Sequence, residues 1–122
     1  MDYVIGCDIG SQSTKAILLS VEGRVLGEAS ADYAIDYPQP AWAEQPVERW
    51  TVALAVAIQQ LLATTGVRPD QVRGLGLASQ VESVVPLDAS GRPLRPAILW
   101  MDRRATEQCE RVRDTLGAPA VL

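Results

Sequence analysis

Short apolar runs separated by short polar turns open the chain and predict three antiparallel strands. These strands are expected at residues 3–8, 15–21 and 25–32. The runs are rich in β-branched residues, and a turn at residues 22–24 separates the second strand from the third, as in a meander. Residues 33–45, which include Pro38, Pro40 and Trp42, read as a loop.

The hydrophobic period then changes to that of an amphipathic helix. Pro46 fits the first turn of this helix, and Gly66 is expected to cap its C-terminus. The apolar positions that recur at helical spacing are Trp50, Leu54, Ile58, Leu61 and Leu62. We expect this helix to cover one face of the sheet, and its stripe needs no ligand to explain it.

The second half of the chain predicts three more strands and a final helix. Residues 72–79 read as a central strand, and their glycines indicate tight packing or a close backbone approach. Further strands are expected at residues 84–88 and 97–101, and a helix at about 103–116. That helix places Ala105, Cys109, Val112 and Leu116 on one side, and Gly117 and Pro119 end it.

This order of elements predicts an α/β protein with a ribonuclease H-like mixed sheet, flanking helices and an inserted hairpin. At least one closing βα unit is absent from the order, which leaves a sheet edge without its partner strand. We therefore expect residues 1–122 to be a fragment of a larger domain, or to have the edge covered by something else.

The turn between the first two strands has the composition of a phosphate-binding loop. Gly10 lets a ligand approach without meeting a Cβ, and Ser11, Ser13 and Thr14 offer hydroxyl donors. Lys15, the only lysine of the chain, adds a compact positive charge. The alternative is an ordinary β-hairpin, because glycine, serine and aspartate favour turns for local reasons.

Asp8 ends the first strand and is costly to bury unless it is paired or lies near a metal. A magnesium ion carried by a nucleotide would satisfy it, since this ion binds carboxylates together with phosphates. The segment from Tyr3 to Leu19 resembles the first phosphate motif of the actin-like ATPase superfamily. It matches neither the Walker A loop nor the dinucleotide-binding glycine pattern.

Two other polar clusters lie beside predicted strands. In an extended chain Gln80 and Glu82 would face one way and could bind a polyhydroxyl ligand, whereas an exposed hairpin tip is the simpler alternative. Asp102 could cap the final helix, which is the more frequent role for such spacing, or Asp102 and Arg103 could line a site after the strand. Arg104 is expected at the surface.

Composition narrows the class of protein. With 48% hydrophobic and 21% charged residues the chain is globular rather than disordered. A net charge of −4 without a basic stripe argues against nucleic acid as a partner. No apolar run is long enough for a membrane span and no signal-peptide pattern opens the chain, so we expect a cytoplasmic protein with no membrane partner.

The chain contains no histidine, which excludes a histidine base, a Ser-His-Asp triad and a histidine metal ligand within it. The two cysteines lie far apart in the sequence. Cys7 belongs to the first apolar run and Cys109 to the amphipathic final helix, so both are expected to be small buried residues rather than ligands or a disulfide.

Four ordered segments together resemble the N-terminal domain of the FGGY carbohydrate kinases, a family that includes xylulokinase, gluconate kinase and glycerol kinase. The resemblance covers almost the whole chain. The segments are the loop from Asp8 to Lys15, Ala41-Trp42-Ala43-Glu44-Gln45-Pro46, Gly74-Leu75-Gly76-Leu77-Ala78-Ser79-Gln80, and the run from Arg95 to Arg104.

This resemblance implies a kinase that phosphorylates a sugar or polyol hydroxyl with ATP and Mg²⁺, in a cleft between two ribonuclease H-like domains. It places Asp8 near the magnesium ion. It places around the ATP phosphates Gly10, Ser11, Ser13 and Lys15. It places beside the sugar Gln80, Val81, Glu82, Trp100 and Asp102. The implied partner is a small sugar or polyol, and the resemblance leaves a homodimer open.

Two departures limit what the resemblance implies. The pair Val81-Glu82 is Met-His in xylulokinases and Arg-Glu in glycerol kinases, so the sugar is left unassigned. The family's catalytic base is an aspartate beyond this chain, and its second domain holds most of the nucleotide. No catalytic residue is therefore expected here, and residues 1–122 alone should lack useful kinase activity.

Two alternatives from other classes stay open. One is an actin-like ATPase module that acts as an activator or sensor, which would be expected to carry clustered cysteines for an iron–sulfur cluster, and none are visible. The other is a non-catalytic remnant that binds a partner.

Overall fold

The computed structural model of the chain describes residues 1–117. Its strands are β1 (Tyr3–Ile9), β2 (Ser13–Ser20), β3 (Val25–Asp32), β4 (Glu44–Gln45), β5 (Val72–Ser79) and β6 (Ala97–Ile98). Its helices are α1 (Glu48–Thr65) and α2 (Thr106–Leu116), and a short 3₁₀ turn, Pro69–Gln71, precedes β5. Among the described residues, neither helix combines the length and the apolar character that a bilayer crossing requires.

The main sheet has the order β3-β2-β1-β5. The first three strands form the predicted antiparallel meander, and β5 pairs with β1 in parallel, so the sheet is mixed as expected. Gly23, at a φ of 89°, makes the predicted turn between β2 and β3. Because β1 and β5 are parallel and adjacent, their carboxyl ends, Ile9 and Ser79, lie together at one end of the sheet.

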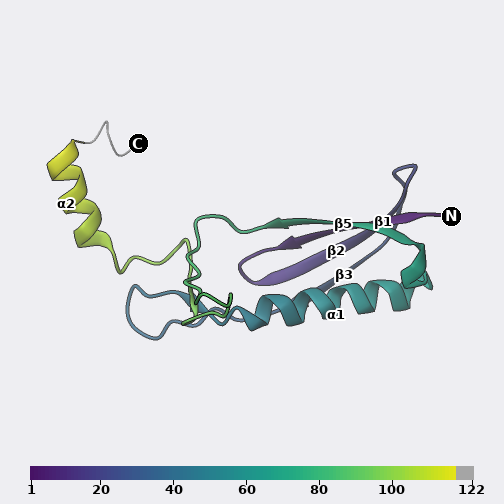
Figure 1. The fold of residues 1–122 in the computed structure, drawn as a ribbon, viewed down its shortest axis with the longest axis horizontal. Helices are drawn as coiled ribbons and strands as arrows, with labels where there is room; N and C mark the ends of the chain where they lie inside the picture. The colour runs from purple at the N-terminus through teal and green to yellow at the C-terminus, as the bar shows by residue number, and fades with distance from the viewer. Residues whose placement is uncertain (118–122) are drawn as a thin grey trace.

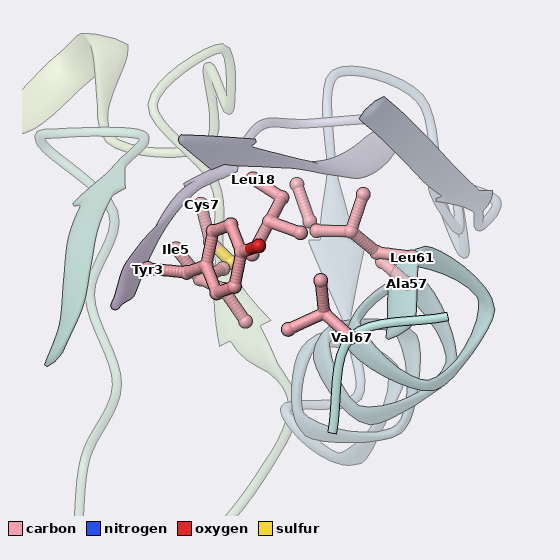
Figure 2. Close-up of a cluster of buried hydrophobic side chains, with 8 residues drawn as sticks. Tyr3, Ile5, Cys7, Leu18, Ala57, Leu61 and Val67 are labelled. Carbon is pink, nitrogen blue, oxygen red and sulfur yellow. The ribbon is translucent and has the colours of Figure 1, made fainter. Parts of the chain in front are cut away.

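Helix α1 packs on β2 and β3 and covers one face of the sheet, as predicted (Figure 1). Figure 2 shows the core at this junction, where sheet side chains such as Ile5 and Leu18 face Ala57, Leu61 and Val67. The helix buries Ala53, Ala57 and Leu61 most completely, whereas the other members of the predicted stripe lie at its half-buried flanks. The two buried alanines have small side chains, which let the helix pack closely against the sheet.

The ends of α1 follow the sequence signals in part. Gly66 adopts the left-handed conformation, at a φ of 69°, and its N–H bonds to the carbonyl of Leu62, which confirms the predicted cap. Pro46 does not lie in the first turn, because the helix begins at Glu48 and residues 46–47 form the turn that leads into it.

Strand β5 is at the edge of the sheet among the described residues, so its predicted central position is wrong for this part of the chain. No described residue pairs with its outer side. A Cβ added to Gly74 or Gly76 would meet nothing within 4 Å, so nothing described requires a glycine there. Leu75 and Leu77 are about half exposed, and Leu75 borders a hollow that Ile58 and Leu62 of α1 also line.

The predictions for the segment after β5 were too regular. Residues 84–88 form no strand but only isolated bridges, Val84 with Ile98 and Leu87 with Pro93. The strand expected at 97–101 is reduced to β6, which pairs with β4 inside the segment expected to be a loop. Pro86 cannot donate a hydrogen bond to a ladder, which limits pairing in this region.

Helix α2 begins at Thr106 rather than near 103, ends at Leu116 with Gly117 after it as predicted, and projects away from the sheet (Figure 1). It buries no residue in the described structure. Cys109 is therefore exposed, which overturns its predicted burial, whereas Cys7 is buried as predicted and burial raises the pKa of its thiol. The predicted stop at Pro119 lies outside the described residues.

Candidate functional site

The loop between β1 and β2 is a tight turn at the carboxyl end of β1. The N–H of Gly10 donates to the carbonyl of Ser13 at 2.9 Å. A Cβ on Gly10 would lie 3.3 Å from that carbonyl, so the turn leaves little room for a side chain there, and the φ of Gly10 is not positive. Among residues 1–117, nothing accepts a hydrogen bond from the N–H of Ser11 or Gln12. Free neighbouring N–H groups of this kind can bind an anion.

Two side chains support this loop, Tyr33 just after β3 and Thr14 at the start of β2. The Tyr33 hydroxyl donates to the carbonyl of Gly10 at 2.6 Å, and burial raises the pKa of the Tyr33 phenol, so it remains a donor. The hydroxyl of Thr14 lies 3.3 Å from that of Tyr33 and is fully buried. Thr14 is therefore a support of the loop, and its predicted use as a hydroxyl donor to a phosphate is wrong.

Asp8 and Lys15 are direct cross-strand neighbours on the sheet face opposite α1. Both are exposed, and neither forms an ion pair with any residue of the described chain. They line a hollow of about 410 Å³ whose floor includes Gly6 and Gly76. A carboxylate and an ammonium group thus lie side by side, each free to bind a ligand, above a lining of glycine and apolar residues.

Ser11 connects the loop to two other predicted site residues. Its hydroxyl donates to the side-chain carbonyl of Gln80 at 3.1 Å and accepts from the indole N–H of Trp100 at 3.0 Å. The backbone N–H of Gln80 also donates to the carbonyl of Ile9, at the end of β1. Gln80 and Trp100 lie 69 and 89 positions beyond Ser11 and were predicted as site residues separately from it. In the structure the three residues form one hydrogen-bonded group.

Gln45 supports the hydrogen-bonded group of Ser11, Gln80 and Trp100 through the backbone of Ser11. The sequence did not single out Gln45 as a site residue. It is fully buried, and its amide N–H groups donate to the carbonyls of Ser11 at 2.7 Å and Ala34 at 3.0 Å. Its amide oxygen accepts from the indole of Trp50 at 2.9 Å. The only sequence signal for Gln45 was its place in a segment that carries the family resemblance, because its partners are distant in the sequence.

Val81 and Glu82 lie on the surface beyond β5. Glu82 has a φ of 61°, so the segment is not extended and the predicted common facing of Gln80 and Glu82 is wrong. A left-handed glutamate stores backbone strain, and strain of this kind concentrates at functional sites. A neighbouring hollow of about 300 Å³ is lined by Trp50, Gln80 and Ser83, whose buried hydroxyl has no partner in the described structure.

Asp102 is not brought to the Ser11 group. Its carboxylate accepts from the N–H of Ala43 at 2.7 Å and from the backbone and guanidinium of Arg104 at 2.7 to 2.9 Å. These bonds hold the pKa of the Asp102 carboxyl far below its usual range, and the side-chain bond from Arg104 contributes most to this shift. The predicted cap is wrong, since the residue before α2 is Ala105 and no side chain caps the helix.

Arg104 is the centre of this second cluster, so its predicted surface position is wrong. Its side chain is 17% exposed, it donates to Glu44 at 2.7 Å, and its guanidinium lies 3.7 Å from the ring centroid of Trp42. Arg95 also pairs with Glu44. The bond to Asp102 is the largest influence that raises the pKa of Arg104. Arg103, the other ligand candidate, is exposed.

The comparisons with known proteins agree with this arrangement. Residues 3–121 match the model of the FGGY family of carbohydrate kinases, N-terminal domain. A xylulose kinase of Lactococcus lactis subsp. lactis is 38% identical over 117 residues, which are 96% of this chain and 23% of that protein. A glycerol kinase of Symbiobacterium thermophilum is 38% identical over 121 residues, 98% of this chain and 24% of that protein.

Solved structures give the same result for the fold. A xylulose kinase of Brucella ovis superposes with a TM-score of 0.86 at 30% identity, over 97% of this chain and 25% of that one. One from Rhodospirillum rubrum gives 0.85 at 30% identity, over 97% and 24%. The ribonuclease H-like, actin-like ATPase fold is thus confirmed, and the chain spans about a quarter of the length of these relatives. The chain belongs to the FGGY family of carbohydrate kinases, within its N-terminal domain.

Proposed function

We propose that residues 1–122 are the N-terminal part of a kinase that transfers the γ-phosphoryl group of ATP to a hydroxyl of a sugar or polyol. The observation that carries this proposal is the position of two free charged groups, Asp8 and Lys15, beside a loop with free N–H groups. The loop in turn contacts Gln80 and Trp100, which lie 69 and 89 positions beyond Ser11 in the sequence. Phosphate-binding and hydroxyl-binding groups therefore adjoin at the carboxyl ends of β1 and β5, where such sheets bind ligands.

In the proposed reaction the substrate hydroxyl attacks the γ-phosphorus in line with the bond to the bridging oxygen, and ADP leaves as that bond breaks. Lys15 and the free N–H groups of Ser11 and Gln12 would hold phosphate oxygens, with Gly10 and Ser13 closing the turn that presents them. Gln80 and Glu82 would orient the hydroxyls of the substrate, with Val81 and Trp100 as apolar walls. The base that takes the proton is proposed to lie outside this chain.

The residues present fit a magnesium ion that arrives with the nucleotide. Asp8 is exposed and forms no ion pair among the described residues, although Lys15 is its direct neighbour. Within residues 1–117 no group of three acidic, cysteine or histidine residues could hold a metal by itself. One carboxylate together with phosphate oxygens is the usual magnesium environment, in which the ion neutralises charge on the phosphates.

Asp102 has a different proposed role from the one that the resemblance implies. Its carboxylate is engaged by Ala43 and Arg104, and its side chain is 4% exposed. We propose that it fixes the segment that carries Trp100 and acts on the sugar only through that segment. We propose a sugar or polyol as the substrate and do not choose between the two classes, because a xylulose kinase and a glycerol kinase match the chain at equal identity. The cytoplasmic location and a homodimer stay predictions.

A chimaera tests the proposal. This chain would replace the matching segment of the xylulose kinase of Lactococcus lactis, and ADP release would be measured with xylulose, glycerol and gluconate. We expect ADP release that depends on at least one of these substrates, and none above background from the 122-residue chain alone. A folded chimaera that releases no ADP with any of them contradicts the proposal and favours a non-catalytic remnant. Turnover by the isolated chain would contradict the assignment of the base to another part of the kinase.

A further inference from the structure

We infer that the Ser11 side chain is a positioning group for the polyol side of the site, while Ser11 serves the phosphates through its backbone N–H. The inference rests on the proposed function for its purpose, but the contacts that it concerns are independent of any ligand. It assigns the hydroxyl of a phosphate-loop residue to Gln80 and Trp100.

The Ser11 hydroxyl has a single proton to donate. A hydroxyl has one O–H to donate and two lone pairs to accept with. The proton of Ser11 is directed to the amide oxygen of Gln80 at 3.1 Å, and one lone pair accepts from Trp100 at 3.0 Å. A phosphate oxygen could take this proton only if the bond to Gln80 broke. The backbone N–H of Ser11, in contrast, has no acceptor within residues 1–117.

The contact decides how Gln80 is oriented. With its oxygen turned to Ser11, its NH₂ group lies 3.4 Å from the carbonyl of Gly10. The main chain of Gln80 is fixed as well, by its bond to Ile9 at 2.8 Å. Loss of the Ser11 hydroxyl would remove the only described partner of the Gln80 oxygen, and the amide could then rotate.

The contact also decides where the Trp100 ring stands. Trp100 is 52% exposed, so packing holds it only in part, and its indole N–H has Ser11 as its partner. The hydrogen bond at its polar edge fixes this large exposed ring, so the ring loses little conformational entropy when a ligand packs against its face. Ser11 therefore sets both the polar and the aromatic side of the surface proposed to face the polyol.

The first test uses the ¹⁵N-labelled 122-residue chain and reads three indole N–H signals, with that of Trp100 identified by its loss in Trp100→Phe. In Ser11→Ala we expect the Trp100 indole and the Gln80 side-chain amide signals to shift. We expect exchange of the Trp100 indole proton to rise about 2- to 12-fold, the range for loss of one hydrogen bond. Ser11→Thr, which keeps a hydroxyl, should restore the signals, and Ser13→Ala should leave them unchanged.

Unchanged Trp100 and Gln80 signals in folded Ser11→Ala would overturn the inference. The unsubstituted chain offers a test without any variant. If its Trp100 indole proton exchanges with solvent as fast as that of free indole, the inference is also overturned. The second test measures kinetics in the chimaera, where Ser11→Ala should raise KM for the polyol at least fivefold more than KM for ATP. The reverse ratio would overturn the inference and leave the proposed kinase intact. An inactive chimaera would contradict the proposed function, and the indole signals would still decide the role of Ser11.

Discussion

Gln45 is predicted to be the most important polar side chain for the stability of the site. Replacing it by leucine keeps the approximate volume of a fully buried residue and removes its three hydrogen bonds. The carbonyl of Ala34 keeps a partner, because the guanidinium of Arg49 donates to it at 2.9 Å. Two groups are left without partners, the carbonyl of Ser11 and the indole N–H of Trp50.

The expected cost follows from these two groups. A buried polar group without a partner costs about 1–3 kcal/mol. Ser11 and Trp50 are each half-buried, so water reaches them in part and the lower half of the range applies. We expect Gln45→Leu to lower the free energy of unfolding by about 2–4 kcal/mol, a large share of the total of about 5–15 kcal/mol that is typical of a domain.

Urea denaturation of the 122-residue chain, monitored by circular dichroism, measures this free energy of unfolding directly. At a slope of about 2 kcal/mol per molar urea, the middle of the usual range, the midpoint should fall by about 1–2 M. Gln59→Leu is the matched control, since it is the same substitution at an exposed position of α1 and should change stability by less than about 0.5 kcal/mol. If the two variants unfold within 0.5 kcal/mol of each other, by the same standard, the reasoning about Gln45 is refuted.

Three further substitutions test the packing, the cap and the ion cluster. Gly27→Ala should cost about 1–3 kcal/mol by thermal unfolding, because its Cβ would lie 2.7 Å from the Cγ2 of Thr65 on α1. Gly66→Ala should cost about 1–2 kcal/mol, because a φ of 69° strains any residue with a Cβ. Asp102→Asn should cost about 1–3 kcal/mol at pH 7 by urea unfolding, because the charge-assisted bonds to Arg104 are lost while Glu44 still pairs with the guanidinium.

Gly27→Ala has a matched control, and Asp102→Asn has a second measurement. Gly74→Ala, whose Cβ would meet nothing within 4 Å, should be neutral or slightly stabilising, and an equal loss at Gly74 and Gly27 would contradict the packing argument. The pKa of Asp102 is depressed in the folded state, so its contribution is complete above about pH 4, the ordinary value, and is lost as the pH falls. Asp102→Asn should therefore flatten the acid limb of the stability curve, and an unchanged acid limb would contradict the assigned pKa.

Elements with local signals were predicted well from the sequence. The meander and α1 follow from hydrophobic period, and the Gly66 cap follows from the conformational freedom of glycine. The pairing of β4 with β6 escaped prediction because it joins Glu44 to Ile98 across 54 positions, with only two residues in each strand. The fold class came from the order of elements, which tolerates such local errors.

The site shows the same division. Asp8, Ser11 and Lys15 stand in one short segment with a recognisable composition, and the structure places them around one loop. The contact of Ser11 with Trp100 could not be predicted, since it depends on how distant segments fold together. Arg104 was misjudged because a charged residue is usually exposed, and only its buried acidic partners make burial favourable.

The central claim is that the β1–β2 loop and its two charged neighbours bind the phosphates and the metal of ATP. The most direct measurement is kcat/KM for ATP of the chimaera that carries Asp8→Asn or Lys15→Met, with Asp70→Asn as the control at an exposed carboxylate. We expect each site substitution to lower kcat/KM by about 10²–10³, the typical cost of removing one group that stabilises transition-state charge, and the control to leave it unchanged. Site variants that consume ATP at the rate of the unsubstituted chimaera would contradict the claim.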